Sequence, residues 1–125
     1  MEINEITEKI IGAAITVHKN LGPGFLESVY QAALAYEMSK NNLAYEKEKE
    51  MPVSYRDVIL DIGFRCDFLV ENKVIVECKA VKALAPVDEA QLLNYLMISS
   101  LHAGLLINFH VLKLKEGIKR IVNNL

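Results

Sequence analysis

The chain has 125 residues, of which 52% are hydrophobic and 24% are charged. This composition is typical of a folded globular protein and excludes a disordered chain, so we expect a single domain over residues 1–125. The net charge of −2 excludes a protein that coats nucleic acid through overall basicity. Any contact with nucleic acid would have to be local or assisted by a metal ion.

The cysteine content and the apolar segments limit the cellular context. Cys66 and Cys78 provide neither a secreted disulfide framework nor the CxxC spacing of a zinc site. The first ten residues, MEINEITEKI, are acidic and amphipathic, unlike a signal peptide. No apolar run approaches the roughly 18 residues that span a bilayer. We therefore expect a soluble cytoplasmic protein without membrane association.

Two helices are expected at the start of the chain. Apolar residues recur at helical spacing from about Ile3 to Lys19, which predicts an amphipathic helix with one buried face. The buried residues should be Ile6, Ile10, Ala13, Ala14 and Val17. The segment NLGPG (20–24) should end this helix, because glycine suits a helix C-terminus and proline cannot continue it. A second helix is predicted over Leu26–Lys40.

The middle of the chain has the pattern of strands. Residues 44–55 alternate charges and include a proline, which is typical of an irregular strand at a sheet edge. Arg56 and Asp57 form a predicted turn. Strict alternation from Leu60 to Val70 predicts one continuous strand. The sequence ENK (71–73) then turns the chain into another strand, from Val74 to Val81.

The last third adds a helix and one or two strands. Pro86 suits the first turn of a helix that should run to about Ser99 and bury Leu92, Leu93, Leu96 and Met97. Residues 104–112 form a buried strand, and a turn at 115–117 leads into a last short strand. The order of helices and strands predicts an α+β fold with helices packed against a mixed sheet.

Strand parity brings three charged side chains together. Glu77 and Lys79 are two residues apart and share a face. If ENK forms a three-residue loop, Asp67 lies opposite Glu77, and Arg65 lies opposite Lys79. A two- or four-residue loop would put Asp67 and Glu77 on opposite faces. With the three-residue loop, the face opposite the charges carries Cys66, Phe68, Val76 and Cys78, and the two thiols are cross-strand neighbours.

Three interpretations of this charged face remain open. The charges could lie on the solvent side of a half-covered sheet. The two acids could instead share a proton, as in paired-carboxylate catalysis. They could also bind a divalent cation, since Mg²⁺ prefers carboxylate oxygens together with waters and substrate phosphate. A lysine beside such a site can stabilise developing charge or orient the attacking water.

Asp67 followed by Glu77-Cys78-Lys79 resembles the PD-(D/E)XK nuclease signature, an acid and then ExK on a hairpin. Two further motifs strengthen the resemblance. Gly24-x-x-Glu27-x-x-Tyr30 is similar to the motif of the uncharacterised GxxExxY family, which is assigned to this superfamily, and the similarity extends over nearly the whole chain. Gln91-x-x-x-Tyr95 is similar to the QxxxY motif of exonuclease-like branches. The resemblance implies a core of a helix, three strands, a helix and a strand.

The resemblance also implies roles for individual residues. Asp67 and Glu77 would hold a metal ion, with a backbone carbonyl near Cys78 as third ligand. Lys79 would act on the water or the transition state, and Glu27 would be the acid that the first core helix contributes. Gln91 and Tyr95 would position Lys79 or the substrate; they are four residues apart and so share a helical face. Cys66 stands where the signature has proline.

The function implied is a nuclease dependent on Mg²⁺ or Mn²⁺ that hydrolyses phosphodiester bonds in nucleic acid through a metal-activated water. The alternative is a catalytically silent member that keeps the fold as a module binding nucleic acid or protein. The near-neutral charge and small size also suggest help from a partner or from homodimerisation. The sequence does not distinguish DNA from RNA.

Overall fold

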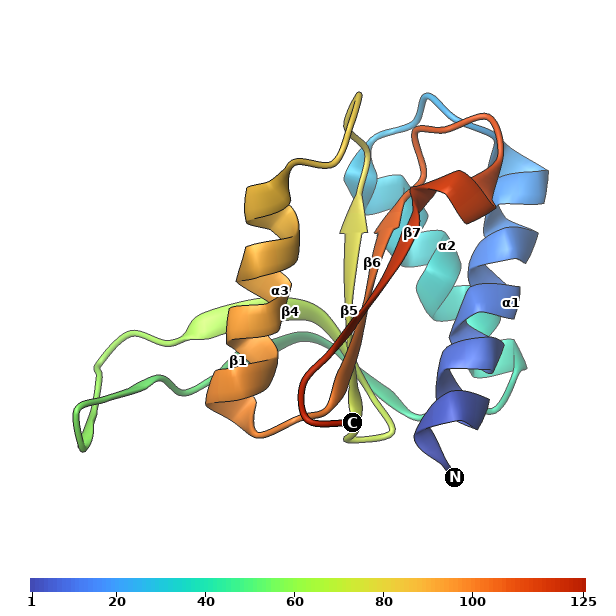
Figure 1. Cartoon of the computed structure of the whole chain (residues 1–125). Coiled ribbons are helices and arrows are strands. Elements are labelled where there is room, and N and C mark those ends of the chain that lie inside the picture. Colours follow the sequence, from blue (N-terminus) through green and yellow to red (C-terminus); the bar gives the residue numbers. More distant parts are fainter.

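A computed structural model describes residues 1–125 and has three helices and seven strands (Figure 1). The elements are α1 (Ile3–Leu21), α2 (Glu27–Lys40), β1 (Tyr45–Met51), β2 (Ser54–Tyr55), β3 (Val58–Ile59), β4 (Phe64–Val70), β5 (Val74–Lys79), α3 (Pro86–Ser99), β6 (Ala103–Asn108), the 3₁₀ turn η1 (Leu114–Gly117) and β7 (Ile118–Val122). None of the helices is long and apolar enough to cross a membrane.

Five strands form one mixed sheet in the order β1-β4-β5-β6-β7. β5 and β6 are parallel, and every other neighbouring pair is antiparallel. A parallel pair needs a crossover connection, which α3 supplies between β5 and β6. α1 and α2 cover one face of the sheet, and α3 covers the other (Figure 1). The α+β fold expected from the sequence is therefore confirmed.

The larger hydrophobic core lies between the sheet and the first two helices. α1 buries the five apolar residues that its periodicity predicts, together with Thr7. They pack with residues of α2 such as Leu34 and Met38 against alternate residues of β4, β5 and β6. From the central strand, Val74, Val76 and Cys78 face this core.

A smaller core lies on the opposite face, under α3. Leu92 and Leu96 are buried as expected, and they pack against Leu69, Ile75 and Leu106. The prediction for Met97 is wrong, since 57% of its surface is exposed. With only one helix on this face, the buried stripe of α3 is narrow. Met97 follows the buried Leu96 and lies outside this stripe.

The strand pair β1–β4 bends in its middle, and the bend changes which face the side chains occupy. The pairs from Tyr45↔Val70 to Met51↔Phe64 all keep one register, but Glu48 and Asp67 in the middle do not pair. Glu48 has φ 54°, in the left-handed region. Phe68 packs in the larger core, whereas Cys66 packs in the smaller one. The expectation that Cys66 and Cys78 share one face is therefore wrong, because alternation is interrupted at Asp67.

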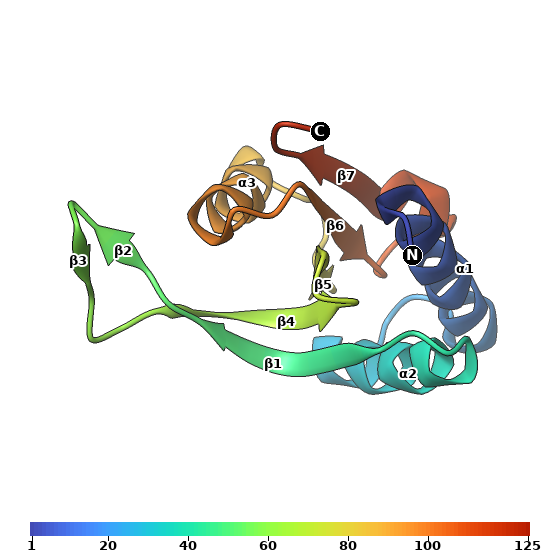
Figure 2. The ribbon, with the colours of Figure 1, turned by 90° about the horizontal axis from the view of Figure 1, so that it is seen from below.

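Beyond this pair, residues 52–63 form an arm that projects from the sheet (Figure 2). Arg56 and Asp57 make the predicted turn, both with positive φ as a type I′ hairpin turn requires. The continuous strand predicted from Leu60 is wrong at its start. β4 begins at Phe64, and residues 60–63 link it to β3, with Gly63 so close to the Met51 carbonyl that a Cβ would clash.

Candidate active site

The turn on which the site depends has the predicted length. β4 and β5 pair at Val70↔Val74, Leu69↔Ile75 and Phe68↔Val76, so that residues 71–73 form a three-residue loop. This register points Asp67 toward Glu77. The strand pairing ends at Phe68↔Val76, one position before the two acids would meet.

The two carboxylates fill the space where the strands separate. The main-chain N–H of Asp67 donates a hydrogen bond of 2.7 Å to Oε2 of Glu77. In return, the N–H of Cys78 donates to Oδ2 of Asp67, also at 2.7 Å. Each acid therefore replaces a ladder hydrogen bond of the opposite strand, and each retains one carboxylate oxygen without a main-chain partner.

Cys78 contributes its main chain to this opening, not its thiol. The Cys78 side chain is fully buried in the core under α1 and α2. In an extended strand the N–H and C=O of one residue point toward the same neighbour. Since the Cys78 N–H points at Asp67, its carbonyl also faces the gap between β4 and β5.

Glu27 comes to the site from the first residue of α2, and its motif explains how it is held there. Gly24 has φ 111°, a conformation that L side chains rarely adopt. The Tyr30 hydroxyl donates to the carbonyl of Gly22 and accepts a bond from the N–H of Phe25 at 3.1 Å. Tyr30 is fully buried and stacks on Phe109 at 4.6 Å between ring centroids. Gly24 and Tyr30 thus fix the loop that begins the helix, which presents Glu27 to the acid pair.

The electrostatics couple these acids to one another. Burial and then the Asp67 charge raise the pKa of Glu77 to about 7. Burial also raises the pKa of Asp67, although its bond from the Cys78 N–H acts in the opposite direction. Burial and the charge of Asp67 raise the pKa of Glu27. Three carboxyl groups therefore resist carrying negative charge together.

Lys79 is the cation that acts on all three acids. Its charge lowers the pKa of Glu27, Asp67 and Glu77. Lys79 forms no ion pair; the only salt bridge in the structure joins Lys49 and Glu46. The ammonium group is thus near the acids without being bound to one of them. One lysine leaves excess negative charge in the site.

Tyr95 lies beside the acids, whereas Gln91 faces solvent. The Tyr95 ring stacks on Phe64 with centroids 4.0 Å apart. Burial and then the charge of Glu77 raise the pKa of its hydroxyl. Gln91, one turn earlier on α3, is exposed, and its side chain forms no hydrogen bond. The structure therefore brings Tyr95 near Asp67, Glu77, Lys79 and Glu27, whereas no contact joins Gln91 to these residues.

Sequence reasoning missed two residues that influence the acids, one through a hydrogen bond and one through its charge. The Gln31 amide donates to Oε1 of Glu27 at 3.3 Å and also lowers the pKa of Asp67. Its position four residues after Glu27, on the same helical face, was a usable signal. Glu48, at the bend opposite Asp67, raises the Asp67 pKa through its charge. Nothing in the alternating charges of residues 46–50 distinguishes it.

The chemistry of the donors fits a divalent cation, although no three side chains among His, Cys, Asp and Glu form a metal-binding group by themselves. Two carboxylates, a strand carbonyl and solvent are hard oxygen ligands. A cation would also offset the excess negative charge. A mixed sheet that opens around an acid pair, with a lysine two residues after the second acid, defines a PD-(D/E)XK type of nuclease fold.

Comparison with known proteins agrees with this class. Residues 4–121 match the sequence model of the PD-(D/E)XK nuclease superfamily, and the chain belongs to that superfamily. No curated protein matches the chain. Among solved structures it is similar to one titled "Crystal structure of SSO0001", with 22% sequence identity and a TM-score of 0.58. That match covers 79% of this chain and 51% of the other, so the chain spans about half the length of that relative.

Proposed function

We propose that this protein is a nuclease that depends on a divalent cation and hydrolyses phosphodiester bonds in nucleic acid. The main supporting observation is the point where β4 and β5 separate. There, the carboxylates of Asp67 and Glu77 each accept a 2.7 Å hydrogen bond from a main-chain N–H of the other strand. Membership of the nuclease superfamily supports this. We further assign the chain to the GxxExxY group, on Gly24, Glu27 and Tyr30.

The cation would be held by the free oxygens of Asp67 and Glu77 and by the carbonyl of Cys78. Mg²⁺ or Mn²⁺ keeps several waters in such sites, so two carboxylates and one carbonyl suffice. When bound, the ion supplies Lewis-acid chemistry, polarising a phosphoryl oxygen and making water more acidic. The pKa of Glu77, about 7 without a cation, would fall on binding, so this carboxylate would bind the ion as an anion.

The remaining residues would act on the substrate and the water. Lys79, unpaired and beside the acids, would stabilise negative charge that develops on the phosphate. Glu27, with its raised pKa, would accept a proton from the attacking water or hold that water in line. Tyr95 and Gln91 would position the nucleic acid at the α3 side of the site.

One observation supports a second candidate, a binding module without catalysis. The Asp67 and Glu77 bonds to main-chain N–H groups satisfy one oxygen of each acid within the protein. The pair therefore also serves to end the strand pairing, a role that needs no cation. Such a module would retain nucleic acid without cutting it.

Cleavage assays separate the two candidates. Wild-type protein should cut single-stranded DNA, duplex DNA or RNA in Mg²⁺ or Mn²⁺, and not in a chelator. Lys79→Ala should lose at least about a hundredfold in rate, because it removes charge stabilisation from the transition state. Lys119→Ala, an exposed lysine on β7, is the matched control and should cut normally. Equal rates for wild type and Lys79→Ala would exclude catalysis by this site.

Metal binding has a readout that does not need the substrate. Mn²⁺ should raise the melting temperature of wild-type protein, since a ligand that binds only the folded state stabilises it. The rise should be smaller in Asp67→Asn and unchanged in Glu116→Gln, which alters an exposed acid of η1. An equal rise in the melting temperature of Asp67→Asn would show that the cation binds at another site.

The proposal extends to partners and location. We propose nucleic acid as the substrate partner and a homodimer as the working form, because one chain has little basic surface. We also propose that residues 1–125 act as one domain in the cytoplasm, on the composition and cysteine arguments given above.

A further inference from the structure

Asn108, the last residue of β6, is one of three polar or charged residues that the protein buries, and only 2% of its surface is exposed. The other two are accounted for, because Thr7 bonds within its own helix and Glu77 belongs to the acid pair. Burial of an amide side chain costs free energy unless its polar groups form hydrogen bonds. The bonds that Asn108 forms therefore indicate what this residue holds in place.

The Asn108 side chain holds the main chain two residues after Lys79. Its Nδ2 donates to the carbonyl of Val81 at 2.9 Å, and its Oδ1 accepts a bond from the N–H of Val81 at 3.1 Å. Oδ1 also accepts a bond from the N–H of His110 at 3.2 Å. Asn108 lies beside Lys79 in the parallel register, at the position where both strands end. Its amide therefore continues the pairing of β5 with β6 beyond the ends of the two strands.

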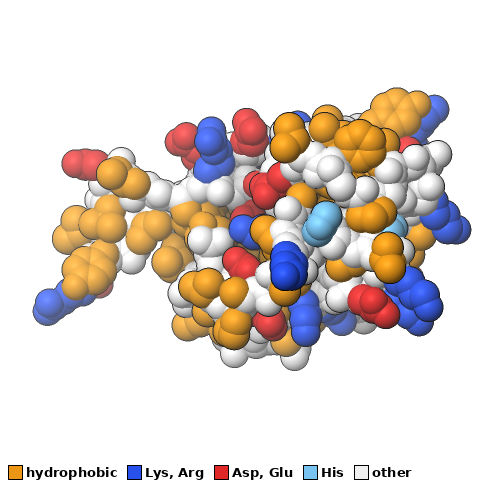
Figure 3. Space-filling view, turned by 90° about the horizontal axis from the view of Figure 1, so that it is seen from above, with side chains coloured by type: hydrophobic (Ala, Val, Ile, Leu, Met, Phe, Trp, Pro, Cys, Tyr) orange, Lys and Arg blue, Asp and Glu red, His pale blue; other side chains and the backbone are white.

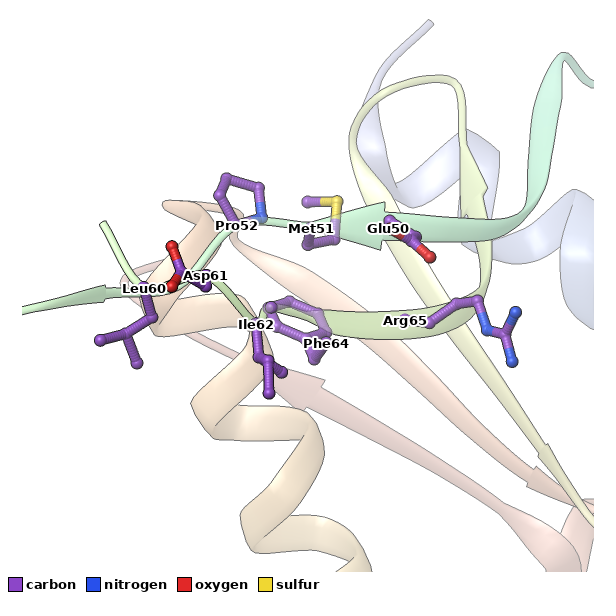
Figure 4. Close-up of a pocket in the computed structure, with 9 residues that line it drawn as sticks. Glu50, Met51, Pro52, Leu60, Asp61, Ile62, Phe64 and Arg65 are labelled. Carbon is purple, nitrogen blue, oxygen red and sulfur yellow. The ribbon is translucent and has the colours of Figure 1, made fainter.

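Lys79 is attached to the sheet from the β6 side alone. β5 pairs with β4 only as far as Val76. Earlier in β4, Arg65 pairs with Glu50 of β1 at the base of the arm (Figure 4). On the β6 side, the N–H of Phe109 donates to the carbonyl of Lys79 at 2.9 Å. The separation of β4 from β5 that creates the site thus leaves the lysine end of β5 dependent on β6.

The surroundings of Lys79 make the direction of its main chain important. Figure 3 looks onto the end of the sheet at which β5 ends, and acidic and basic side chains lie close together there. Lys79 forms no ion pair, so no carboxylate holds its ammonium group. A lysine has a flexible four-carbon side chain, and a catalytic group displaced by about 1 Å can cost about a hundredfold in rate.

We propose that Asn108 is a positioning residue for Lys79, a role that rests on the nuclease function proposed above. The Phe109 N–H fixes the carbonyl of Lys79, and Asn108 fixes Val81 two residues later. With both ends of this segment attached to β6, the Lys79 side chain leaves the main chain in one direction. Without the Asn108 amide, the segment would be attached only at Lys79 itself, and its ammonium group would spread over more positions.

A double-mutant cycle on cleavage tests whether Asn108 acts through Lys79. Asn108→Ala should lose about tenfold in kcat, with KM within about twofold of the wild-type value, because Lys79 acts on the transition state. In a Lys79→Ala background the same change should cost less than about twofold, since the group that Asn108 positions is gone. An equal tenfold loss in both backgrounds would overturn the proposal, because Asn108 would then act on the fold alone.

Asn123→Ala is the matched control for this cycle. The Asn123 amide donates to the carbonyl of Leu101 at 3.0 Å, a bond of the same kind near the opposite end of β6. This variant should cleave at the wild-type rate. Far-UV circular dichroism checks that each variant is folded. If Asn108→Ala does not fold, Asn108→Asp takes its place in the cycle, because it keeps the acceptor for both N–H groups and loses only the bond to the Val81 carbonyl.

Amide hydrogen exchange measured by NMR tests the attachment without a substrate. In Asn108→Ala, the N–H groups of Val81 and Phe109 should exchange at least about tenfold faster than in wild type, whereas that of Leu105 within β6 should not. Unchanged exchange at Phe109 would overturn the proposal, because the Lys79 carbonyl would then be held without Asn108. A wild-type protein that cuts no nucleic acid would contradict the proposed function alone, and the exchange rates would still decide whether Asn108 holds the chain at Lys79.

Discussion

At the scale of single residues, Asp67 and Glu77 combine two roles that compete. Their bonds to main-chain N–H groups hold the opened strands, which favours ionised carboxylates. Their burial next to each other disfavours two negative charges. The sequence predicted that the two acids lie opposite each other, but within a continuous strand pairing. In the structure they lie where the pairing has ended. Sites arranged for function commonly lose stability in this way.

This competition predicts a pH dependence of stability in chelator. The Glu77 pKa is raised from 4.5 to about 7, so the folded state keeps a proton that the unfolded state has already released. The free energy of unfolding should therefore fall as pH rises from 4.5 to about 7, by at most about 3 kcal/mol. Glu77→Gln should remove this slope and be more stable than wild type at pH 8. Urea unfolding at pH 5 and pH 8 measures it, and a Glu77→Gln effect equal at both pH values would contradict it.

Tyr30 has a structural role, whereas Glu27 of the same motif is a candidate for the chemistry. Tyr30→Phe keeps the stack on Phe109 but removes the hydroxyl that ties Gly22 and Phe25. We expect a loss of about 1–3 kcal/mol in unfolding free energy, because two partly buried main-chain groups lose their partner. Tyr36→Phe, which alters an exposed tyrosine of the same helix, should change it by less than about 0.5 kcal/mol. Similar values for both variants would show that the loop does not depend on Tyr30.

At the scale of helices and strands, the sequence predicted most elements because each has a local cause. The helix periodicity of α1, the proline at the start of α3 and the short ENK turn all act within a few residues. The errors come from interactions between distant strands. Leu60 continues the alternation that starts β4, but the arm turns there, and Cys66 changes face because β1 bends opposite Asp67. A pattern of period two contains no information about such a bend.

The bend itself gives a prediction about Glu48. A left-handed φ of 54° costs an L residue about 1–2 kcal/mol, and a β-branched side chain suffers most. In an ordinary strand, valine is more favourable than glycine by up to about 1 kcal/mol. At position 48 the order should reverse, so that Glu48→Gly is more stable than Glu48→Val in urea unfolding. Both variants remove the same charge, so electrostatics cancel in the comparison. A more stable Glu48→Val would mean that β1 is not bent at this residue.

At the scale of the whole molecule, the sheet separates two unequal cores. The core under α1 and α2 contains 18 buried residues, and the core under α3 contains 6. Less buried apolar surface means a lower free energy of local opening. In hydrogen exchange measured by mass spectrometry, peptides of α3 should therefore exchange faster than those of α1 and β5. Since Tyr95 of α3 stacks on Phe64 and lies close enough for the Glu77 charge to raise its pKa, opening of α3 should also expose Glu77. A bound cation in contact with Glu77 should then leave the exchange of α3 slower than in chelator, and equal protection of α1 and α3 in chelator would contradict the separation into two cores.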